Sequence, residues 1–362
     1  MKIAIDLRML RHSGITSYLV NTLPHLIRDH PEAHFYLLGD PRQMDEHAWT
    51  HAENVTRTEC IASIYSLSEQ WKVARRVPRD SDLLWCPHYN IPLLYRGKLV
   101  VTLHDALHLA MPQFVGAGPH KRAYARIMFT ALRRKATTIM CDSRFTAAEL
   151  ARCIPGPEAQ LHVIYLGVSE SWFHVEKGPR PHERPYLLYV GNVKPHKNLR
   201  RLLNAFELVR DRIPHDLLIV GQREGFITPD DAAGAKALEL GNRVHFTGHV
   251  DDATLRQCYT HADALVFPSL YEGFGLPPLE AMACGCPVAT SRAASLPEVC
   301  GDAALYFDPH SETDIAEKIE QIASDRELRA GLVAKGIERA QGFRWQDTAA
   351  SVWNVLRAAG AT

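Results

Sequence analysis

Short apolar runs alternate with helical patterns along almost the whole chain, and this alternation restricts the fold more than any other feature. In the first half, the apolar runs are residues 3–5, 34–38, 83–86, 99–103, 138–141 and 162–165. In the second half, they are residues 186–190, 217–220, 244–246, 264–267, 287–289 and 304–307. Because strands separated by helices pair in parallel, the pattern predicts an α/β architecture with parallel sheets.

The alternation is interrupted once, by a stretch rich in proline and charge, and restarts after it. That stretch, residues 171–185, has no periodicity and is typical of a linker. A chain of 362 residues is also too long for one ordinary core. We therefore expect two doubly wound, Rossmann-like domains, residues 1–170 and 186–342, with a ligand in the cleft between them at the carboxyl ends of the strands. Residues 343–358 carry apolar side chains at helical spacing and are predicted to form a final helix.

Composition argues against several classes of protein. Lysine plus arginine and aspartate plus glutamate number 41 each, so no net field attracts nucleic acid. No run of about 18 apolar residues occurs, and the amino terminus is typical of a first strand rather than a signal peptide. The eight cysteines form no C-x-x-C pair, which favours buried free thiols in a reducing cytoplasm. A metal clamp at Cys284 and Cys286 is the alternative.

The run PSLYEGFGLPPLEAMACG, residues 268–285, holds the main candidate site. Gly273 and Gly275 remove side chains where a ligand approaches the backbone, and two prolines suit a first helical turn. The unpaired N–H groups and the dipole of the following helix favour an anion, most naturally a phosphate. Glu272 and Glu280 flank this cradle and would repel a phosphate, so we expect them to bind sugar hydroxyls. The alternative is an ordinary strand–turn–helix with two solvated acids.

The two glutamates give an E-x7-E motif that resembles the signature of retaining glycosyltransferases of family 4. The resemblance covers nearly the whole chain. It implies the GT-B fold, two Rossmann-like domains facing a central cleft, with the final helix packed back on the N-terminal domain. It also implies that Glu272 contacts the transferred sugar and that Glu280 contacts the ribose hydroxyls of the nucleotide. The diphosphate then meets the amides around Phe274, Gly275 and Leu276.

A strand, a glycine turn at Gly191 and a helix start make a second candidate phosphate contact. Breaking a sugar–phosphate bond requires a cation at the leaving diphosphate, and the resemblance places that role on Lys197. Many members of the family also carry an arginine directly after the glycine, where this chain has Asn192. The phosphate cage therefore lacks one expected cation, and Lys194 and Arg223 are the candidates to replace it. The alternative for Lys197 is a surface lysine at a helix start.

His104 ends a buried strand of the first half, where it is placed to face the cleft and hydrogen-bond a sugar hydroxyl. The equivalent histidine of the family lies beside the donor sugar and the acceptor, and the resemblance gives that role to His104. The alternative is a histidine that caps its strand and pairs with the adjacent Asp105. The chain has 19 histidines, so only position favours this one.

Two further loops of the first half are candidates for ligand contact. Members of the family usually show two adjacent glycines after the first strand, and this chain keeps one, Gly14, preceded by Ser13. With one glycine instead of two, we expect this loop to approach the donor diphosphate less closely than in those members. His88 and Tyr89 follow another strand and are candidates to touch the acceptor. The alternative for His88 and Tyr89 is an ordinary packing role.

No metal site is expected. Asp80 and Asp82 match the D-x-D pattern with which another glycosyltransferase fold holds a metal-bound nucleotide sugar. That device needs an apolar strand immediately before the acids, and an arginine-rich run stands there instead. The match is interpreted as chance, and no other cluster of ligands suggests a metal.

A predicted helix over residues 120–134 places Arg122, Arg126 and Arg133 on one face, with apolar residues opposite. Such a basic face fits peripheral contact with anionic lipid, as expected of an enzyme with a lipid-linked acceptor at the inner membrane. A solvated surface is the alternative.

The resemblance implies a retaining hexosyltransferase with a nucleotide diphosphate sugar as donor and no further cofactor. The runs YVGNVKPHKNL and VVTLHDALHLAMP are most similar to mannosyl- and rhamnosyl-transferring members that build bacterial surface polysaccharides, which favours a donor of the GDP-mannose type. The acceptor is then a saccharide or a polyprenyl-linked saccharide. The departing phosphate oxygen takes the acceptor's proton, while Glu272 and His104 orient the sugar.

Two other functions compete with this interpretation. A nucleotide-sugar epimerase of the same fold also cleaves the sugar–phosphate bond, but it needs acids and bases at the sugar ring, and no such cluster stands out. A catalytically weak binding partner is suggested by Asn192 in place of the usual arginine. The retained Glu272, Glu280, Lys197 and His104 argue against this second alternative.

Overall fold

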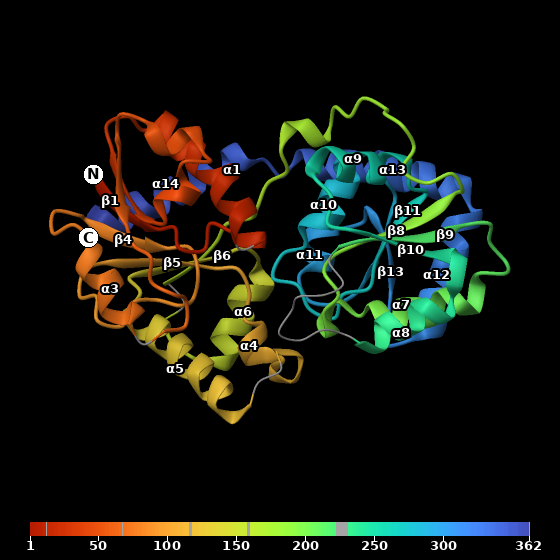
Figure 1. Cartoon of the computed structure of the whole chain (residues 1–362), viewed down its shortest axis with the longest axis horizontal. Helices are drawn as coiled ribbons and strands as arrows, with labels where there is room; N and C mark the ends of the chain where they lie inside the picture. The colour runs from red at the N-terminus through yellow and green to blue at the C-terminus, as the bar shows by residue number, and fades with distance from the viewer. Residues whose placement is uncertain (12, 67, 116–117, 158–159, 222–230, 362) are drawn as a thin grey trace. The chain divides into compact units, whose positions relative to one another are not determined.

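The computed structural model describes the chain except residues 12, 67, 116–117, 158–159, 222–230 and 362. It divides into two compact units, which are coloured along the chain in Figure 1. The first unit comprises Met1–Ala110, Gly118–Gly167 and Arg344–Thr362. The second unit comprises Met111–Ala117 and Val168–Phe343.

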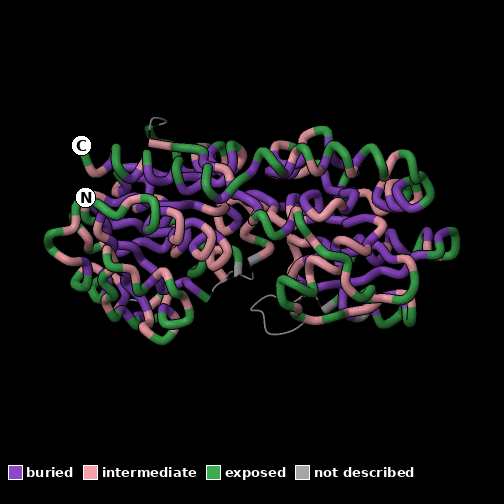
Figure 2. The backbone as a smooth tube through the Cα atoms, turned by 90° about the horizontal axis from the view of Figure 1, so that it is seen from above, coloured by how far each residue is buried: buried purple, intermediate pink, exposed green. Residues whose placement is uncertain are grey.

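The first unit is built on one parallel sheet of seven strands in the order β3-β2-β1-β4-β5-β6-β7. Strands β4, β5 and β6 are buried at every position, as expected for short apolar runs in a parallel sheet covered on both faces. The strands are β1 (Lys2–Asp6), β2 (His34–Gly39), β3 (Val55–Glu59), β4 (Leu83–Cys86), β5 (Leu99–Leu103), β6 (Thr138–Cys141) and β7 (Leu161–Val163). Figure 2 shows buried backbone in the interior of each unit, with exposed segments around it.

The helices of the first unit include the end of the chain. They are α1 (Ser13–Asp29), α2 (Pro41–Met44), α3 (Glu69–Arg76), α4 (Leu107–Ala110), α5 (Pro119–Lys135), α6 (Arg144–Cys153) and α14 (Trp345–Ala361). Helix α14 packs against α1 and β6 within this unit. Val352 and Leu356 are fully buried, and Trp353 stacks on His30 with ring centroids 3.8 Å apart. Burying such apolar side chains stabilises the unit by roughly 1.5–3 kcal/mol each.

The second unit repeats the design with six parallel strands in the order β10-β9-β8-β11-β12-β13. The strands are β8 (Tyr186–Val190), β9 (Asp216–Val220), β10 (Val244–Gly248), β11 (Ala264–Phe267), β12 (Val288–Ser291) and β13 (Ala304–Phe307). The helices are α7 (Leu199–Val209), α8 (Asp231–Glu239), α9 (Asp252–His261), α10 (Leu276–Ala283), α11 (Leu296–Cys300), α12 (Glu312–Ser324) and α13 (Arg326–Gln341).

Each sheet has a point where the direction of winding reverses. This switch point lies between β1 and β4 in the first unit and between β8 and β11 in the second. Loops that leave the carboxyl ends of two such strands diverge and form a crevice, which is where doubly wound folds bind ligands. The predicted α/β class with two parallel, Rossmann-like sheets is confirmed.

The structure differs from the expected elements at instructive places. Strand β3 was not predicted, because it is an edge strand of sequence VTRTE that is buried at no position and so lacks an apolar run. The segment before β8 belongs to the second unit, although a separate linker was expected at residues 171–185. Its backbone is fastened to α9, since Gln257 accepts from the Gly178 N–H and donates to the Glu176 carbonyl, both at 2.8 Å.

The basic face predicted on α5 is smaller than expected. Arg122 and Arg126 are exposed, but Arg133 is buried and donates to Gln160 Oε1 at 3.1 Å. The prediction for Arg133 was wrong because helical spacing does not reveal that a loop covers the last turn of the helix. Among the described residues, no helix has the length and apolar content needed to cross a membrane. All eight cysteines are free thiols, and six of them are buried.

The loops that follow β8 and β9 touch through their backbones. A Cβ on Gly221 would lie 2.2 Å from the Gly191 carbonyl oxygen, and Gly221 has φ +150°. No other residue fits this position without displacing the neighbouring loop. The contact fixes the turn at Gly191, which enters the candidate site described below.

We predict that Gly221→Ala destabilises the second unit by roughly 2–4 kcal/mol, from the clash and the strained φ together. Gly331→Ala is the control, because a Cβ there meets no atom within 4 Å in the middle of α13. That change should stabilise the protein by about 0.5–1 kcal/mol. Thermal unfolding followed by circular dichroism measures both, and equal melting temperatures for the two variants would refute the close approach.

Candidate functional site

The candidate phosphate-binding loops lie at the switch point of the second sheet, where β8 and β11 are neighbours. Gly191 directly follows β8, and its N–H donates to the Val220 carbonyl at 2.9 Å. Glu272 lies in the loop after β11, and Lys197 ends a short helical turn after β8. Adjacent parallel strands end at one edge of a sheet, so this topology brings together residues that the sequence places about 75 positions apart.

Helix α10 begins with a first turn that is open to an anion. Its N-cap residue, Gly275, has φ +108° and supplies no capping side chain. This left-handed φ favours glycine, and a Cβ there would also lie 2.8 Å from Leu296 Cδ2. Pro277 and Pro278 have no N–H, which makes Gly275 and Leu276 the predicted amide donors of this turn. The helix dipole adds a positive potential at the same place. The ring of Phe274 is buried against Phe343 with centroids 5.9 Å apart, so its predicted contribution is its backbone alone.

Lys197 and Glu272 form an ion pair beside this turn. Lys197 Nζ lies 2.7 Å from Glu272 Oε1 and 3.0 Å from Oε2. The two side chains are only 19 % and 13 % exposed, so solvent screens the pair less than it screens a surface pair. The sequence predicted a separate role for each residue but not that they pair with one another.

Asn198 holds the two halves of this ion pair in place. It is buried, with φ +60°, and its Nδ2 donates to the carbonyls of Pro268 at 3.0 Å and Pro309 at 2.8 Å. The Leu270 N–H donates to the His196 carbonyl at 2.8 Å and ties the same two loops together. Sequence reasoning missed Asn198, although an asparagine before a helix is a known signal for a left-handed turn.

Ser295, at the start of α11, braces the glycine-rich loop. Its Oγ lies 2.7 Å from the Phe274 carbonyl and 3.0 Å from the Glu272 carbonyl, so its single proton is shared between the two. Ser295 is fully buried. The loop that carries Glu272 is therefore held from both sides by side chains that do not face the ligand.

Glu280 lies on α10, and its carboxyl group accepts a hydrogen bond from Tyr259 Oη at 3.4 Å. Burial raises the pKa of Glu280 to about 7, and the negative charge of Asp252 adds to the increase. The carboxyl group is thus more readily protonated near neutral pH than that of an exposed glutamate. It stands on the same helix as the open first turn, four residues beyond Leu276.

In the first unit, His104 directly follows β5 and is fixed by a partner that the sequence did not suggest. Its Nδ1 lies 2.7 Å from Asp142 Oδ2, and its Nε2 lies 3.1 Å from the Pro87 carbonyl. Both partners offer acceptor oxygens, an arrangement that favours a proton on each ring nitrogen. Burial alone would lower the pKa of His104, but the charge and hydrogen bond of Asp142 raise it above its ordinary value.

Asp142 was missed, and the alternative pairing of His104 with Asp105 was wrong. Asp105 instead accepts a hydrogen bond from the Leu107 N–H at 2.9 Å. Asp142 is buried and directly follows β6, the strand that pairs with β5. A polar residue after each of two neighbouring strands is the signal that could have revealed the pair.

His88 faces the interior of the first unit instead of a ligand. It is 2 % exposed, and its Nε2 lies 3.2 Å from Asp6 Oδ2. Asp6 also accepts from Arg8, which pairs in turn with Glu69 at 2.7 Å. Burial alone would raise the pKa of Asp6, but the charges of Arg8 and His88 hold it below its usual range. Tyr89 stacks on a core phenylalanine with centroids 4.7 Å apart, so both residues follow the packing alternative.

The remaining predicted residues are placed as follows. Gly14 lies in the first turn of α1, where a Cβ would meet no atom within 4 Å. Asn192 follows Gly191 in the loop after β8 and is half-buried. Lys194 precedes the turn that carries Lys197. Arg223 lies outside the described residues, so its candidacy as the missing cation is untested.

The D-x-D pattern has a structural role at the start of β4. Asp80 Oδ2 lies 2.5 Å from Lys2 Nζ, and the Lys2 N–H donates to Asp82 Oδ2 at 2.7 Å. Both acids are therefore engaged at the amino end of the first sheet, opposite the edge at which ligands bind in doubly wound folds. This placement agrees with the interpretation of the motif as a chance match.

Comparison with known proteins places the chain in a family. The sequence model of "Glycosyl transferases group 1" matches residues 170–339, and that of "Glycosyltransferase Family 4" matches residues 12–172. O-antigen chain mannosyltransferase B of Escherichia coli is 32 % identical over 292 residues, which cover 75 % of this chain and 73 % of that protein. The serotype-specific mannosyltransferase WbdA of Escherichia coli is 34 % identical over 285 residues, or 75 % of this chain. The match spans only 34 % of WbdA's length.

Solved structures share the fold at lower sequence identity. Sucrose-phosphate synthase from Thermosynechococcus elongatus has a TM-score of 0.81 and 21 % identity, covering 100 % of this chain and 99 % of that one. Anabaena HepE, solved in complex with UDP and glucose, has a TM-score of 0.74 and 19 % identity, covering 99 % and 100 %. The predicted GT-B fold is confirmed, and the relatives agree with the predicted hexosyl transfer in polysaccharide synthesis. The chain therefore belongs to glycosyltransferase family 4 and is a glycosyltransferase.

Proposed function

We propose that this glycosyltransferase moves a mannosyl residue, with retention of configuration, from a nucleotide diphosphate sugar of the GDP-mannose type. The acceptor is a saccharide or a polyprenyl-linked saccharide of a bacterial surface polysaccharide. The names of the relatives support the sugar, since both of those described above are mannosyltransferases. The observation that carries the mechanism is the ion pair of Lys197 and Glu272 beside the open first turn of α10.

The donor diphosphate binds at the first turn of α10. Its oxygens accept hydrogen bonds from the backbone amides of Phe274, Gly275 and Leu276. The positive end of the helix dipole attracts its negative charge. The glycine turn at Gly191 allows the backbone of the loop after β8 to approach the same anion. Anabaena HepE, whose solved complexes hold UDP and UDP-glucose, supports a nucleotide sugar as the ligand of this fold.

Donor binding divides the ion pair between the two parts of the ligand. Lys197 Nζ leaves Glu272 and turns to the diphosphate, where its charge stabilises the leaving group as the sugar–phosphate bond breaks. Glu272, released from the lysine, accepts hydrogen bonds from hydroxyls of the transferred sugar. The bond from the anomeric carbon to the phosphate oxygen breaks and the bond to the acceptor oxygen forms on the same face. The acceptor's proton passes to the departing phosphate oxygen, and no metal or further cofactor takes part.

Glu280 completes the proposed site of the second unit, and His104 has a proposed role of its own in the first unit. Glu280, four residues beyond Leu276 on α10, accepts the ribose hydroxyls of the nucleotide. His104 donates to an oxygen of the transferred sugar through Nε2–H, which now points at the Pro87 carbonyl. Its pair with Asp142 favours the protonated ring, so we expect it to act as a donor and not as a base.

We also propose that the enzyme works at the cytoplasmic face of the inner membrane and touches it through α5. Arg122, Arg126 and Arg134 are exposed on this helix, and the apolar Ile127 is 59 % exposed beside them. Arginines around an exposed apolar side chain suit a surface of anionic lipid, where each basic residue contributes about 1 kcal/mol.

The ion pair predicts opposite behaviour for its two members. Lys197→Ala should weaken nucleoside diphosphate binding by roughly 2–3 kcal/mol, the size of a charge-assisted hydrogen bond. Glu272→Ala should leave that affinity equal or tighter, because Lys197 is released, while turnover falls by at least about 100-fold. Lys335→Ala, which removes the ion pair of Lys335 with Asp302 on the surface of the same unit, is the control. Calorimetry measures the affinity for nucleoside diphosphate, and initial rates measure turnover. An equal loss of affinity in the Lys197 and Glu272 variants would refute the separate roles of the two residues.

The raised pKa of Glu280 predicts a pH dependence of donor binding. An ionised carboxylate accepts from two vicinal hydroxyls, so the bound donor favours the charged form and lowers the pKa of Glu280 below about 7. Affinity for the intact nucleotide sugar should therefore fall by up to about tenfold per pH unit below 7 and level off above it. Glu280→Gln should bind more weakly with a flat profile over the same range. Parallel profiles in the two proteins would exclude a contact between Glu280 and the ribose.

The lipid contact is tested by sedimentation with vesicles of anionic and of neutral phospholipid. The protein should pellet with the anionic vesicles at low salt, and the double variant Arg122→Glu, Arg126→Glu should stay in the supernatant. Arg152→Glu, on the exposed side of α6, is the control. Equal pelleting of all three proteins would show that α5 is a solvated surface.

A further inference from the structure

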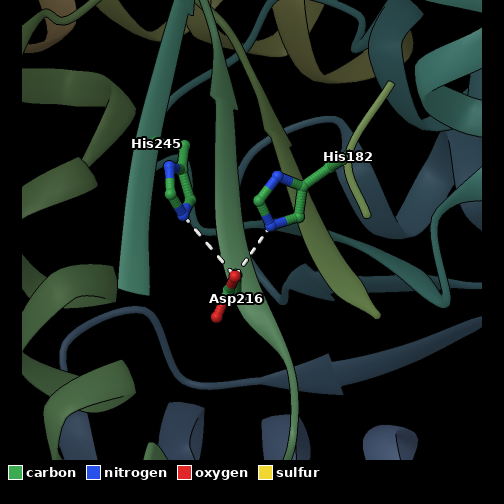
Figure 3. A group of neighbouring side chains, drawn as sticks. All are labelled: His182, Asp216 and His245. Carbon is green, nitrogen blue, oxygen red and sulfur yellow. Dashed lines mark hydrogen bonds and ion pairs between the residues drawn. The ribbon is translucent and has the colours of Figure 1, made fainter. Parts of the chain in front are cut away.

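Three side chains from separate segments converge at the amino end of β9, at the edge of the second sheet opposite the candidate site. They are His182 from the segment before β8, Asp216 from the first position of β9, and His245 from β10. Figure 3 shows both imidazole rings directed at the same carboxylate. His182 Nε2 lies 2.7 Å from Asp216 Oδ2, and His245 Nε2 lies 3.5 Å from the same oxygen.

The two oxygens of Asp216 have different surroundings. Oδ1 faces guanidinium groups, with Arg243 Nε at 2.8 Å and Arg184 Nη1 at 3.3 Å. Oδ2 faces the two histidines. Arg243 also donates to the backbone carbonyls of the loop before β9, which locks its position. The arginines thus orient the carboxylate as outer-shell groups orient a metal ligand, and they leave Oδ2 directed at the imidazoles.

His245 Nε2 supplies a second, independent observation. This nitrogen is shielded from solvent and makes no hydrogen bond with any described residue. It lies at ion-pair distance from Asp216 Oδ2 without hydrogen-bond geometry. A buried polar atom without a partner costs roughly 1–3 kcal/mol, which a bound ligand would recover.

We propose that His182, Asp216 and His245 bind a divalent transition-metal ion, with Zn²⁺ the best fit. Two imidazole nitrogens and one carboxylate oxygen are a known three-residue ligand set for zinc, with a fourth position left for water. Their three ligand atoms lie within 4.8 Å of one another. Ligand atoms of a tetrahedral zinc ion lie about 3.3 Å apart, given bonds of about 2.0–2.1 Å. The separation of His245 from Asp216 matches this value, and His182 must retreat by about half an ångström.

The metal takes the place of the proton between His182 and Asp216. That proton moves from Nε2 to Nδ1 of the same ring, so that both histidines bind as neutral imidazoles through Nε2. The side chains of His182 and His245 are 19 % and 37 % exposed, which gives the ion a path from solvent.

The proposed ion has a structural role and takes no part in the reaction. Two of its ligands lie at the amino ends of β9 and β10 and the third precedes β8, whereas Gly191 and Glu272 of the candidate site follow the carboxyl ends of β8 and β11. It fastens the segment that leads into β8, already tied to α9 through Gln257, to the sheet itself. The inference stands independently of the proposed donor and sugar.

The test is a titration of the demetallated full-length protein with Zn²⁺, read by calorimetry and by melting temperature. One equivalent should bind and raise the melting temperature, since a ligand of the native state stabilises it. His182→Gln and His245→Gln should each lower the affinity by at least tenfold and abolish the thermal shift. His174→Gln, whose side chain is 77 % exposed on the same segment as His182, should behave like the unchanged protein.

Two controls keep the outcome decisive. Circular dichroism establishes that each variant is folded before titration, and Asp216 is left unchanged because it also neutralises Arg243 and Arg184. A chelator should lower the melting temperature of the zinc-loaded protein without changing its affinity for nucleoside diphosphate. The proposal is overturned if Zn²⁺ does not bind, if all four proteins bind it alike, or if the chelator leaves the melting temperature unchanged.

Discussion

The ion pair of Lys197 and Glu272 is the interaction on which the candidate site depends. Its two members come from the loops after β8 and β11, which only the switch point of the parallel sheet brings together. In the absence of donor, each charge satisfies the other, so neither is left unpaired in a partly desolvated place. In the proposed function, a donor brings an anion to the lysine and hydroxyls to the glutamate, so that binding replaces one pair of interactions by two.

Buried side chains of the second unit hold the two loops that carry this ion pair. Asn198 and Ser295, both buried, hold the loop carbonyls on either side of the pair, and neither needs to touch a ligand. Gly275 and Gly221 let the backbone pass where no side chain fits. The first unit holds its candidate residue through the side chain itself. His104 is oriented by Asp142 and the Pro87 carbonyl, so its ring is held in position within the unit.

Much of the fold follows from local sequence, because a buried strand in a parallel sheet must be an apolar run and an amphipathic helix must repeat its apolar face. Among the described residues, that logic located twelve of the thirteen strands and failed at β3, where an edge strand of polar residues carries no such signal. It also located the loops of the site, since glycine and proline mark turns locally. Contacts between residues distant in sequence were missed. Examples are the pairing of His104 with Asp142, the burial of Arg133 against Gln160, and the convergence of His182, Asp216 and His245. Such contacts depend on strand order, which periodicity does not contain.

A crystal structure of the protein with a bound nucleoside diphosphate sugar tests the central claim most directly. The account predicts the pyrophosphate against the first turn of α10, with Lys197 Nζ within hydrogen-bond distance of a phosphate oxygen and Glu272 turned to the hydroxyls of the sugar. A pyrophosphate bound elsewhere, with Lys197 still paired to Glu272 as in the free protein, would contradict it.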